Sequence, residues 1–266
     1  MIDRGRIAVA KPRAASDRRR NGSPLSRARW RSWLAFVVID VPVAVAAFES
    51  DGPDILERAG LDYELVQIPP GTADMTPQMQ RIADSGADVV QVLGNDTFCI
   101  AVYRGLTAAG YDGEITSVSQ CITDATRQAL RGGDLEGISV ISSIALGATE
   151  DPSYRQYEAV MAAYGGDVED VENIYGMGAY AVTSALATSL EGISGDITPE
   201  SVTQTIKAMP EREMPGGGGV AFRCGGSAVA SLPAVCTNQW LRATLDADGQ
   251  PAGYTVEDSS DLLEGA

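Results

Sequence analysis

The chain has 266 residues, of which 44% are hydrophobic and 21% charged, so its length and composition suit one large globular domain or two smaller lobes. It contains no histidine, which excludes Ser-His-Asp and Cys-His nucleophile systems and removes the commonest metal ligand. Its four cysteines form no C-x-x-C motif, so a structural zinc site is not expected. We therefore expect a protein that is not an enzyme and that has no catalytic residues, metal or cofactor.

Charge is distributed unevenly along the chain. Residues 1–34 hold ten Lys or Arg and two acidic residues, with two prolines and no apolar period, which predicts a basic, disordered head. Residues 35–266 hold ten basic and 34 acidic residues, so this body would repel the phosphates of nucleic acids. We expect no nucleic acid partner for the body, and a contact between the head and DNA stays open as an alternative.

The first apolar run, residues 33–48, has two interpretations. A basic flank, an apolar middle and small residues at Ala44–Ala46 are typical of a signal peptide. Phe36–Ile39, ended by Asp40 and Pro42, instead indicates a buried parallel strand. The acidic residue inside the run and the long basic segment before it favour the strand, so the sequence has no clear signal peptide.

Strand-like and helical segments alternate between residues 35 and 145, with strand starts about every 25 residues, the length of one βα unit. Right-handed crossovers then place helices on both faces of a five-stranded parallel sheet. The expected strands are Phe36–Ile39, Glu64–Ile68, Asp88–Leu93, Glu114–Val118 and Gly137–Ile141, and the expected helices are Asp54–Ala59, Asp74–Asp84, Thr97–Ala109 and Asp124–Leu130.

The pattern changes after Gly147, where three successive helices are expected. Since Ala179–Leu190 is almost wholly small and apolar, it should be buried against something large. The three helices have no sheet of their own, so they either pack on each other or cover a sheet encoded upstream. The expected elements after Gly147 are helices Pro152–Tyr164, Gly178–Leu190 and Pro199–Ala208, a flexible Gly216–Gly219 loop, a short strand Val220–Arg223 and a frayed acidic tail at 256–266.

Ligands of open parallel sheets sit outside the carboxyl ends of the strands, and this rule selects the candidate site. Asn95 and Gln120, which follow the third and fourth strands, carry amides suited to orienting a small polar solute. For Asp96 and Thr97, ligand contact and simple capping of the next helix stay open. The segments selected by this rule are Asp40–Ala44, Pro70–Thr72, Gly94–Thr97 and Ser119–Cys121, with Asp40 and Ala44 as further candidate ligand-binding residues.

The cysteines suggest two disulfides. Cys99 and Cys121 each lie just past the end of consecutive strands, within bridging reach, although two buried free thiols are an alternative. Cys224 and Cys236 enclose a short loop that a disulfide would close. Two disulfides would indicate an oxidising compartment.

In the order and spacing of its segments, the body resembles type I periplasmic binding proteins of the leucine/isoleucine/valine-binding group. The resemblance covers residues 36 to about 256. It rests on Val37-Val38-Ile39-Asp40-Val41-Pro42, Ile68-Pro69-Pro70-Gly71-Thr72-Ala73-Asp74, Val89–Thr97, Leu106–Gly110, Gly137-Ile138, Asp151-Pro152-Ser153-Tyr154 and Phe222-Arg223-Cys224-Gly225-Gly226.

The resemblance implies two α/β lobes, joined by three strands, that close on a solute. It assigns residues 35–145 to lobe two, a parallel βα layer, and 146–223 to the remaining helical part of lobe one. Residues 224–266 become a C-terminal hinge and strand segment with an acidic tail. The family pattern places a further βα array before Phe36, so we expect the chain to be an N-terminally truncated fragment.

The implied function is that of the solute-binding component of an ABC-type importer, located outside the cytoplasm, with a membrane permease as partner. The implied solute is a branched-chain amino acid or a similar small polar metabolite. The chain departs from the amino-acid binders at Val43 and Ala44, where they place an aromatic residue, and at Gln120, where they place an acid, so an amide or small acid fits as well. The alternative is the ligand-sensing domain of a regulatory protein, with the basic head as an arm.

Overall fold

The computed structural model of the chain describes residues 32–130, 133–168, 171, 173–230 and 232–263, which all belong to one compact unit, residues 31–266. The expected basic head therefore lies outside the described residues, except for its last three positions. Trp33 and Leu34 begin the first strand, because they continue the apolar run in register with the neighbouring strands, so the head ends before the expected boundary at residue 34.

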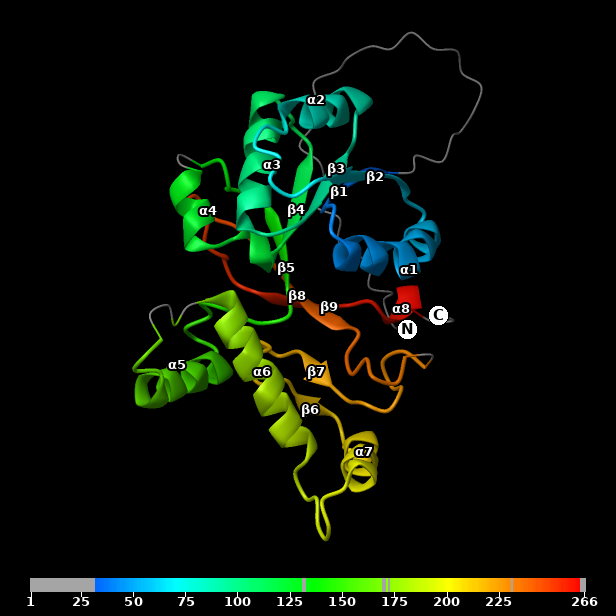
Figure 1. The fold of residues 1–266 in the computed structure, drawn as a ribbon, viewed down its shortest axis with the longest axis vertical. Helices are drawn as coiled ribbons and strands as arrows, with labels where there is room; N and C mark the ends of the chain where they lie inside the picture. Colours follow the sequence, from blue (N-terminus) through cyan, green and yellow to red (C-terminus); the bar gives the residue numbers. More distant parts are fainter. Residues whose placement is uncertain (1–31, 131–132, 169–170, 172, 231, 264–266) are drawn as a thin grey trace, which may run out of the picture. The chain divides into compact units, whose positions relative to one another are not determined.

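A seven-stranded sheet organises residues 33–142 and 239–258, in the order β2-β1-β3-β4-β5-β8-β9 (Figure 1). The first five strands along this order are parallel, which confirms the expected βα layer. Because the order reverses at β1, the ends of β1 and β3 form the switch point of the sheet. The parallel strands are β1 (Trp33–Ile39), β2 (Asp62–Ile68), β3 (Val89–Leu93), β4 (Glu114–Val118) and β5 (Ser139–Ser142).

Helices follow each of the first four strands, and the first of them is much longer than expected. The sequence predicts a helix only over Asp54–Ala59, but α1 begins at Pro42 and passes through Pro53. It persists because Phe48 is buried, with its ring 4.5 Å from that of Phe36 on β1. The helices are α1 (Pro42–Ala59), α2 (Thr76–Ser85), α3 (Asp96–Ala108) and α4 (Asp124–Ala129), with a 3-10 turn η1 (Ser119–Cys121) after β4.

The main hydrophobic core lies between the sheet and helices α2 and α3. Alternate residues of β1, Ala35 and Val37, are fully buried in this core, as the two-residue period of a strand requires. Met79 of α2 and Leu106 of α3 meet them from the helical side. This packing fixes the carboxyl ends of the strands, where the candidate site was expected.

Two further strands, both antiparallel, extend the sheet beyond the five parallel strands and lie in the expected C-terminal strand segment. β8 (Gln239–Thr244) runs antiparallel to β5, and β9 (Thr255–Asp258) runs antiparallel to β8. A short helix, α8 (Ser260–Leu263), follows β9. The expectation of a frayed tail from residue 256 is therefore wrong for the described residues, because strand pairing and this helix order them up to residue 263.

Residues 143–238 leave the sheet after β5 and return to it at β8. They contain helices α5 (Pro152–Tyr164), α6 (Ile174–Ser189) and α7 (Pro199–Ala208), and the two-stranded pair of β6 (Arg212–Glu213) with β7 (Ala221–Phe222) (Figure 1). Helices α5 and α7 match their expected bounds, since polar caps and prolines mark their starts. Helix α6 begins at Ile174, four residues before the expected start at Gly178, because the side chain of Asn173 caps it there. A second core joins α5 and α6 through residues Ile144, Tyr154, Tyr157, Ile174, Met177 and Ala181.

Helix α6 buries only part of its apolar surface against the rest of the described chain. Met177 is fully buried, whereas the side chains of Val182 and Leu186 are 72% and 50% exposed. The expectation that the whole apolar stretch is buried is therefore wrong for the part of the chain that the structure describes.

The glycine run before β7 is packed rather than an open connection. Gly216 and Gly217 are buried, and the carbonyl oxygen of Gly216 accepts a hydrogen bond from the backbone nitrogen of Ala145 at 2.8 Å. Gly218 has a φ of 56°, and a Cβ built there would lie 2.8 Å from the Cβ of Ala145. The expected flexible loop thus has a defined path that only glycine permits.

Candidate functional site

A cavity of about 650 Å³ lies between the end of β4, the turn after β5 and helix α6. This volume falls in the range of pockets that take small organic ligands. It is lined by Ser119, Gln120, Ser143, Ile144, Ile174, Tyr175, Gly178, Ala181, Val182, Ala185, Leu186, Ser189, Ile206, Met214, Phe222, Cys224, Ala234 and Cys236.

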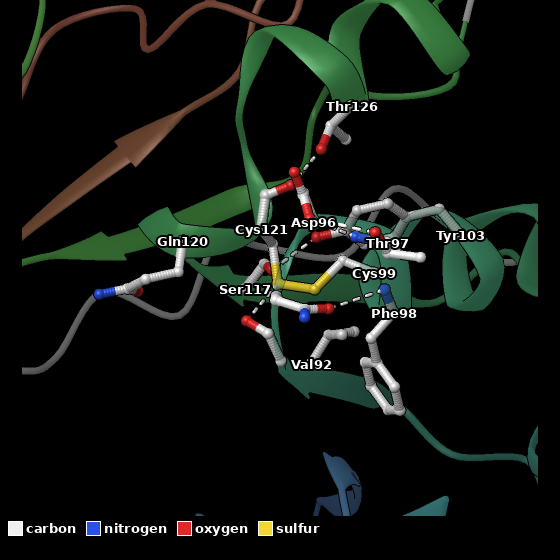
Figure 2. The surroundings of a disulfide bond; sticks show 12 residues. Val92, Asp96, Thr97, Phe98, Cys99, Tyr103, Ser117, Gln120, Cys121 and Thr126 are labelled. Carbon is white, nitrogen blue, oxygen red and sulfur yellow. Dashed lines mark hydrogen bonds between the residues drawn. A yellow bond between two sulfur atoms is a disulfide. The ribbon is translucent and has the colours of Figure 1, made fainter. Parts of the chain in front are cut away.

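The 3-10 turn η1 presents Gln120 to the cavity. Its neighbour Cys121 is buried and bonded to Cys99 of α3, and the carbonyl oxygen of Cys121 accepts a hydrogen bond from the Thr126 hydroxyl at 2.7 Å. Figure 2 shows the Gln120 side chain pointing away from this disulfide. Its amide oxygen lies 3.5 Å from the Ser119 hydroxyl, and its amide nitrogen has no hydrogen-bond partner among the described residues. The anchored turn therefore leaves the amide NH2 group, with its two N–H donors, available.

Beneath η1, a buried hydrogen bond supports the end of β4. The Tyr103 hydroxyl lies 2.5 Å from the hydroxyl of Ser117, and both residues are almost completely buried (Figure 2). Burial raises the pKa of Tyr103 well above its ordinary value, so the hydroxyl stays neutral. This contact stabilises the strand that leads into Gln120.

The turn after β5 contributes Ser143 and Ile144. The Ser142 hydroxyl donates to the carbonyl oxygen of Ile144 at 2.7 Å and accepts from its backbone nitrogen at 3.2 Å. Because these bonds use the hydroxyl of the buried Ser142, they fix the turn and leave the exposed Ser143 at the cavity.

Helix α6 forms the apolar wall. The Asn173 side chain caps the helix by accepting a hydrogen bond from the backbone N–H of Tyr175 at 2.9 Å. Because α6 begins at this cap, its first residues, Ile174 and Tyr175, line the cavity. Tyr175 is 61% exposed, and Gly178 would have nothing within 4 Å of an added Cβ. The first turns of α6 therefore leave open space next to the polar groups of η1.

Of the residues selected from the sequence, Gln120 lines the cavity and Asn95, Asp96 and Thr97 do not. The Asn95 side chain accepts the backbone N–H of Phe98 at 3.0 Å, so Asn95 is the cap of α3. The capping role considered for Asp96 or Thr97 therefore falls to Asn95, one or two residues earlier.

The remaining candidate residues, Asp96, Asp40 and Ala44, make only local contacts or lie within a helix. Asp96 accepts the backbone N–H of Thr97 at 2.6 Å and lies 3.4 Å from the Thr123 hydroxyl. Asp40 is exposed, and its backbone nitrogen donates to the carbonyl oxygen of Ile68. Ala44 lies in the first turn of α1 and not in a loop, because the helix begins at Pro42. The structure does not bring these residues to the cavity.

Sequence analysis did not select Ser143, Tyr175 or Gly178. Ser143 follows the fifth strand, so the rule about strand ends would have found it if it had been applied to β5. The α6 residues carry no such signal, since only tertiary packing places this helix opposite η1.

Both expected disulfides are present. Cys99 and Cys121 are joined, as are Cys224 and Cys236, and no free cysteine remains. The second pair lines the cavity at the loop that follows β7. Among the described residues, no group of His, Cys, Asp or Glu side chains could hold a metal ion, and no helix has the length and hydropathy needed to cross a membrane.

Solved structures similar to this chain include proteins described as parts of ABC transporters. A branched-chain amino acid ABC transporter protein from Thermus thermophilus with bound valine matches with a TM-score of 0.66 and 16% identity, over 89% of this chain and 63% of that one. A fatty acid ABC transporter substrate-binding protein from Thermomonospora curvata gives 0.63 and 16%, over 89% and 59%. A solute-binding protein from Rhodopseudomonas palustris HaA2 in complex with p-hydroxybenzoic acid gives 0.61 and 19%, over 86% and 61%.

At these identities the similarity establishes the fold, and the chain spans about three-fifths of the length of these relatives. No curated protein sequence matches the chain. The sequence model of the family described as periplasmic binding protein matches residues 34–238, which is most of the chain and includes η1 and α6. The chain therefore belongs to the periplasmic binding protein family.

Proposed function

We propose that this protein is the solute-binding component of an ABC-type importer, acting outside the cytoplasm and delivering its solute to a membrane permease. The observation that carries the proposal is the cavity in which Gln120 of η1 faces the first turns of α6. The similar structures support this class of function. They are described as a branched-chain amino acid ABC transporter with bound valine, a fatty acid ABC transporter substrate-binding protein, and an ABC transporter solute-binding protein in complex with p-hydroxybenzoic acid.

In this proposal, residues 33–142 and 239–258 act as one lobe and residues 143–238 belong to the other. The solute binds between them, with its polar end at Ser119, Gln120 and Ser143 and its body against α6. Closing two lobes on a solute removes water and strengthens each hydrogen bond, which is how such a cleft gains affinity. The Cys99–Cys121 disulfide holds Gln120 in place before the solute arrives, which lowers the entropy lost on binding.

A cavity-blocking variant tests this proposal. The full chain is screened by thermal denaturation against amino acids, amides, aromatic acids and fatty acids, because a ligand that binds the folded state raises the melting temperature. Gly178→Leu places a side chain in the open space of the cavity. It should weaken binding of any active compound at least about tenfold in calorimetry, which corresponds to about 1.4 kcal/mol.

Gly166→Leu is the matched control, since Gly166 is exposed, has nothing within 4 Å of an added Cβ and lies outside the cavity. This variant should bind as the unmodified chain does. A screen in which no compound raises the melting temperature contradicts the proposal, and so does a compound that Gly178→Leu binds unchanged.

A further inference from the structure

The lining of the cavity contains no residue that is charged at neutral pH. None of its eighteen residues is an Asp, Glu, Lys or Arg, although charged residues make up 21% of the chain. The polar groups are the hydroxyls of serine and tyrosine and the amide of Gln120. The described part of the chain therefore offers the cavity only uncharged hydrogen-bonding partners.

We infer that the solute of this cavity is an uncharged molecule with an apolar body and one neutral polar end, such as a primary amide. This inference rests on the proposed function and names its substrate class. The juxtaposition that carries it is Gln120 and Ser143 on one side and the apolar face of α6 on the other.

The electrostatic cost of burying charges disfavours an amino acid as the solute. An α-amino acid carries an ammonium and a carboxylate, and each loses its hydration when the cleft closes. A buried charge is stable only with an opposite charge or several hydrogen bonds, and no carboxylate lines this cavity to receive the ammonium. A neutral amide has the donor and acceptor pattern that hydroxyl and amide groups satisfy.

The arrangement of the lining fixes which end of the solute goes where. Ser119 and Gln120 follow β4, and Ser143 follows its neighbour β5, so these three polar side chains come from adjacent strand ends. The Tyr175 hydroxyl is the further polar side-chain group on α6 at the exposed start of the helix. Ser189 also lines the cavity, but its hydroxyl already donates to the carbonyl oxygen of Ala185 at 2.7 Å. The apolar wall is formed by Ile174, Val182, Leu186, Ile206 and Phe222.

Three compounds that share one body and differ in charge test this inference on the full chain. They are 3-phenylpropanamide, which is neutral, 3-phenylpropanoate, which is an anion, and L-phenylalanine, which is a zwitterion. Titration calorimetry should show the amide binding at least about tenfold more tightly than either charged compound, because each of those leaves a charge unpaired.

Gln120→Glu supplies the missing carboxylate and should shift the ratio of the affinities for L-phenylalanine and the amide about tenfold toward L-phenylalanine. Gln128→Glu makes the same change on the exposed side of α4, away from the cavity, and should leave the ratio unchanged.

Tighter binding of L-phenylalanine or of the anion by the unmodified chain overturns the inference and leaves the proposed solute-binding function standing. Binding of none of the three also overturns it. The thermal screen of the wider library then decides the proposed function separately, since that screen includes charged and uncharged compounds of other shapes.

Discussion

Gly218 has a backbone conformation and a close contact that constrain the loop between β6 and β7. Its φ of 56° lies in the left-handed region, and a Cβ there would approach the Cβ of Ala145 to 2.8 Å. Gly218→Ala should lower the free energy of unfolding by about 1–3 kcal/mol, from both backbone strain and overpacking. Gly253→Ala, with a φ of 82° and nothing within 4 Å, carries the strain alone. Urea denaturation that gives equal losses for both variants would exclude the steric contribution.

Asn95 has a structural role that its position in the sequence did not distinguish from ligand binding. Its side chain caps α3 through the backbone N–H of Phe98. Asn95→Ala should therefore lower the free energy of unfolding by about 1 kcal/mol, whereas Asn95→Ser should largely restore it, because serine also caps helices well. Calorimetry should find the solute affinity of both variants unchanged. If Asn95→Ala lowers the free energy of solute binding by more than it lowers the free energy of unfolding, then Asn95 contacts the solute.

Only part of the candidate site could be predicted, because one type of side chain can serve both as a helix cap and as a ligand-binding group. The rule about strand ends led to Gln120, which lines the cavity because η1 follows β4 directly. It led equally to Asn95, because amides suit both helix caps and ligands, and only the observed hydrogen bond separates these roles. Tyr175 could not be found, since its place opposite η1 depends on packing between segments far apart in the sequence.

Tyr254 connects the β8–β9 hairpin to the segment that follows β5. Its hydroxyl donates to the carbonyl oxygen of Leu146 at 3.0 Å, and burial raises its pKa to about 12 from an ordinary value of 10. The neutral hydroxyl is the form that the folded state favours. Its contribution is therefore complete below pH 10 and is lost as the pH rises from 10 to about 12.

Denaturation measured from pH 8 to pH 11 should show this loss. Tyr254→Phe should be less stable than the unmodified chain at pH 8, since it lacks the hydrogen bond, and should lose about 1 kcal/mol less between pH 8 and pH 11. Tyr103 and Tyr111 have pKa values raised in the same direction, so part of the alkaline loss should remain in the variant. If the free energy of unfolding depends on pH identically in the two proteins, then Tyr254 does not contribute to the alkaline loss of stability.

Helices and strands that are marked by local sequence signals could be predicted, whereas a strand that forms only by pairing with a distant strand could not. The strands β1 to β5 and the helices α5 and α7 follow apolar runs, caps and prolines. β8 had a readable signal, since its residues Leu241 and Ala243 are buried, as is Leu245 just after the strand, in the alternation that a strand requires. β9 had a weak signal, because only the first two of its four residues, Thr255 and Val256, favour strands, whereas Glu257 and Asp258 do not. It forms because the hairpin brings it to the edge of β8.

For the molecule as a whole, the sheet and helix α6 play different parts. The sheet has a closed core on the side of α2 and α3, whereas α6 leaves Val182 and Leu186 exposed in the described chain. The relatives are longer, and this chain spans about three-fifths of them. In the proposed function, the solute binds where η1, the turn after β5 and α6 meet, and not at the switch point of β1 and β3.

Amide hydrogen exchange tests this claim most directly. It is measured on the full chain with and without the compound that raises the melting temperature most in the screen. The account predicts slower exchange in the bound state at three separate segments together, namely Ser119–Cys121, Ser143–Ile144 and the first two turns of α6. Protection confined to residues 40–44 and 94–97, at the ends of β1 and β3, would contradict it.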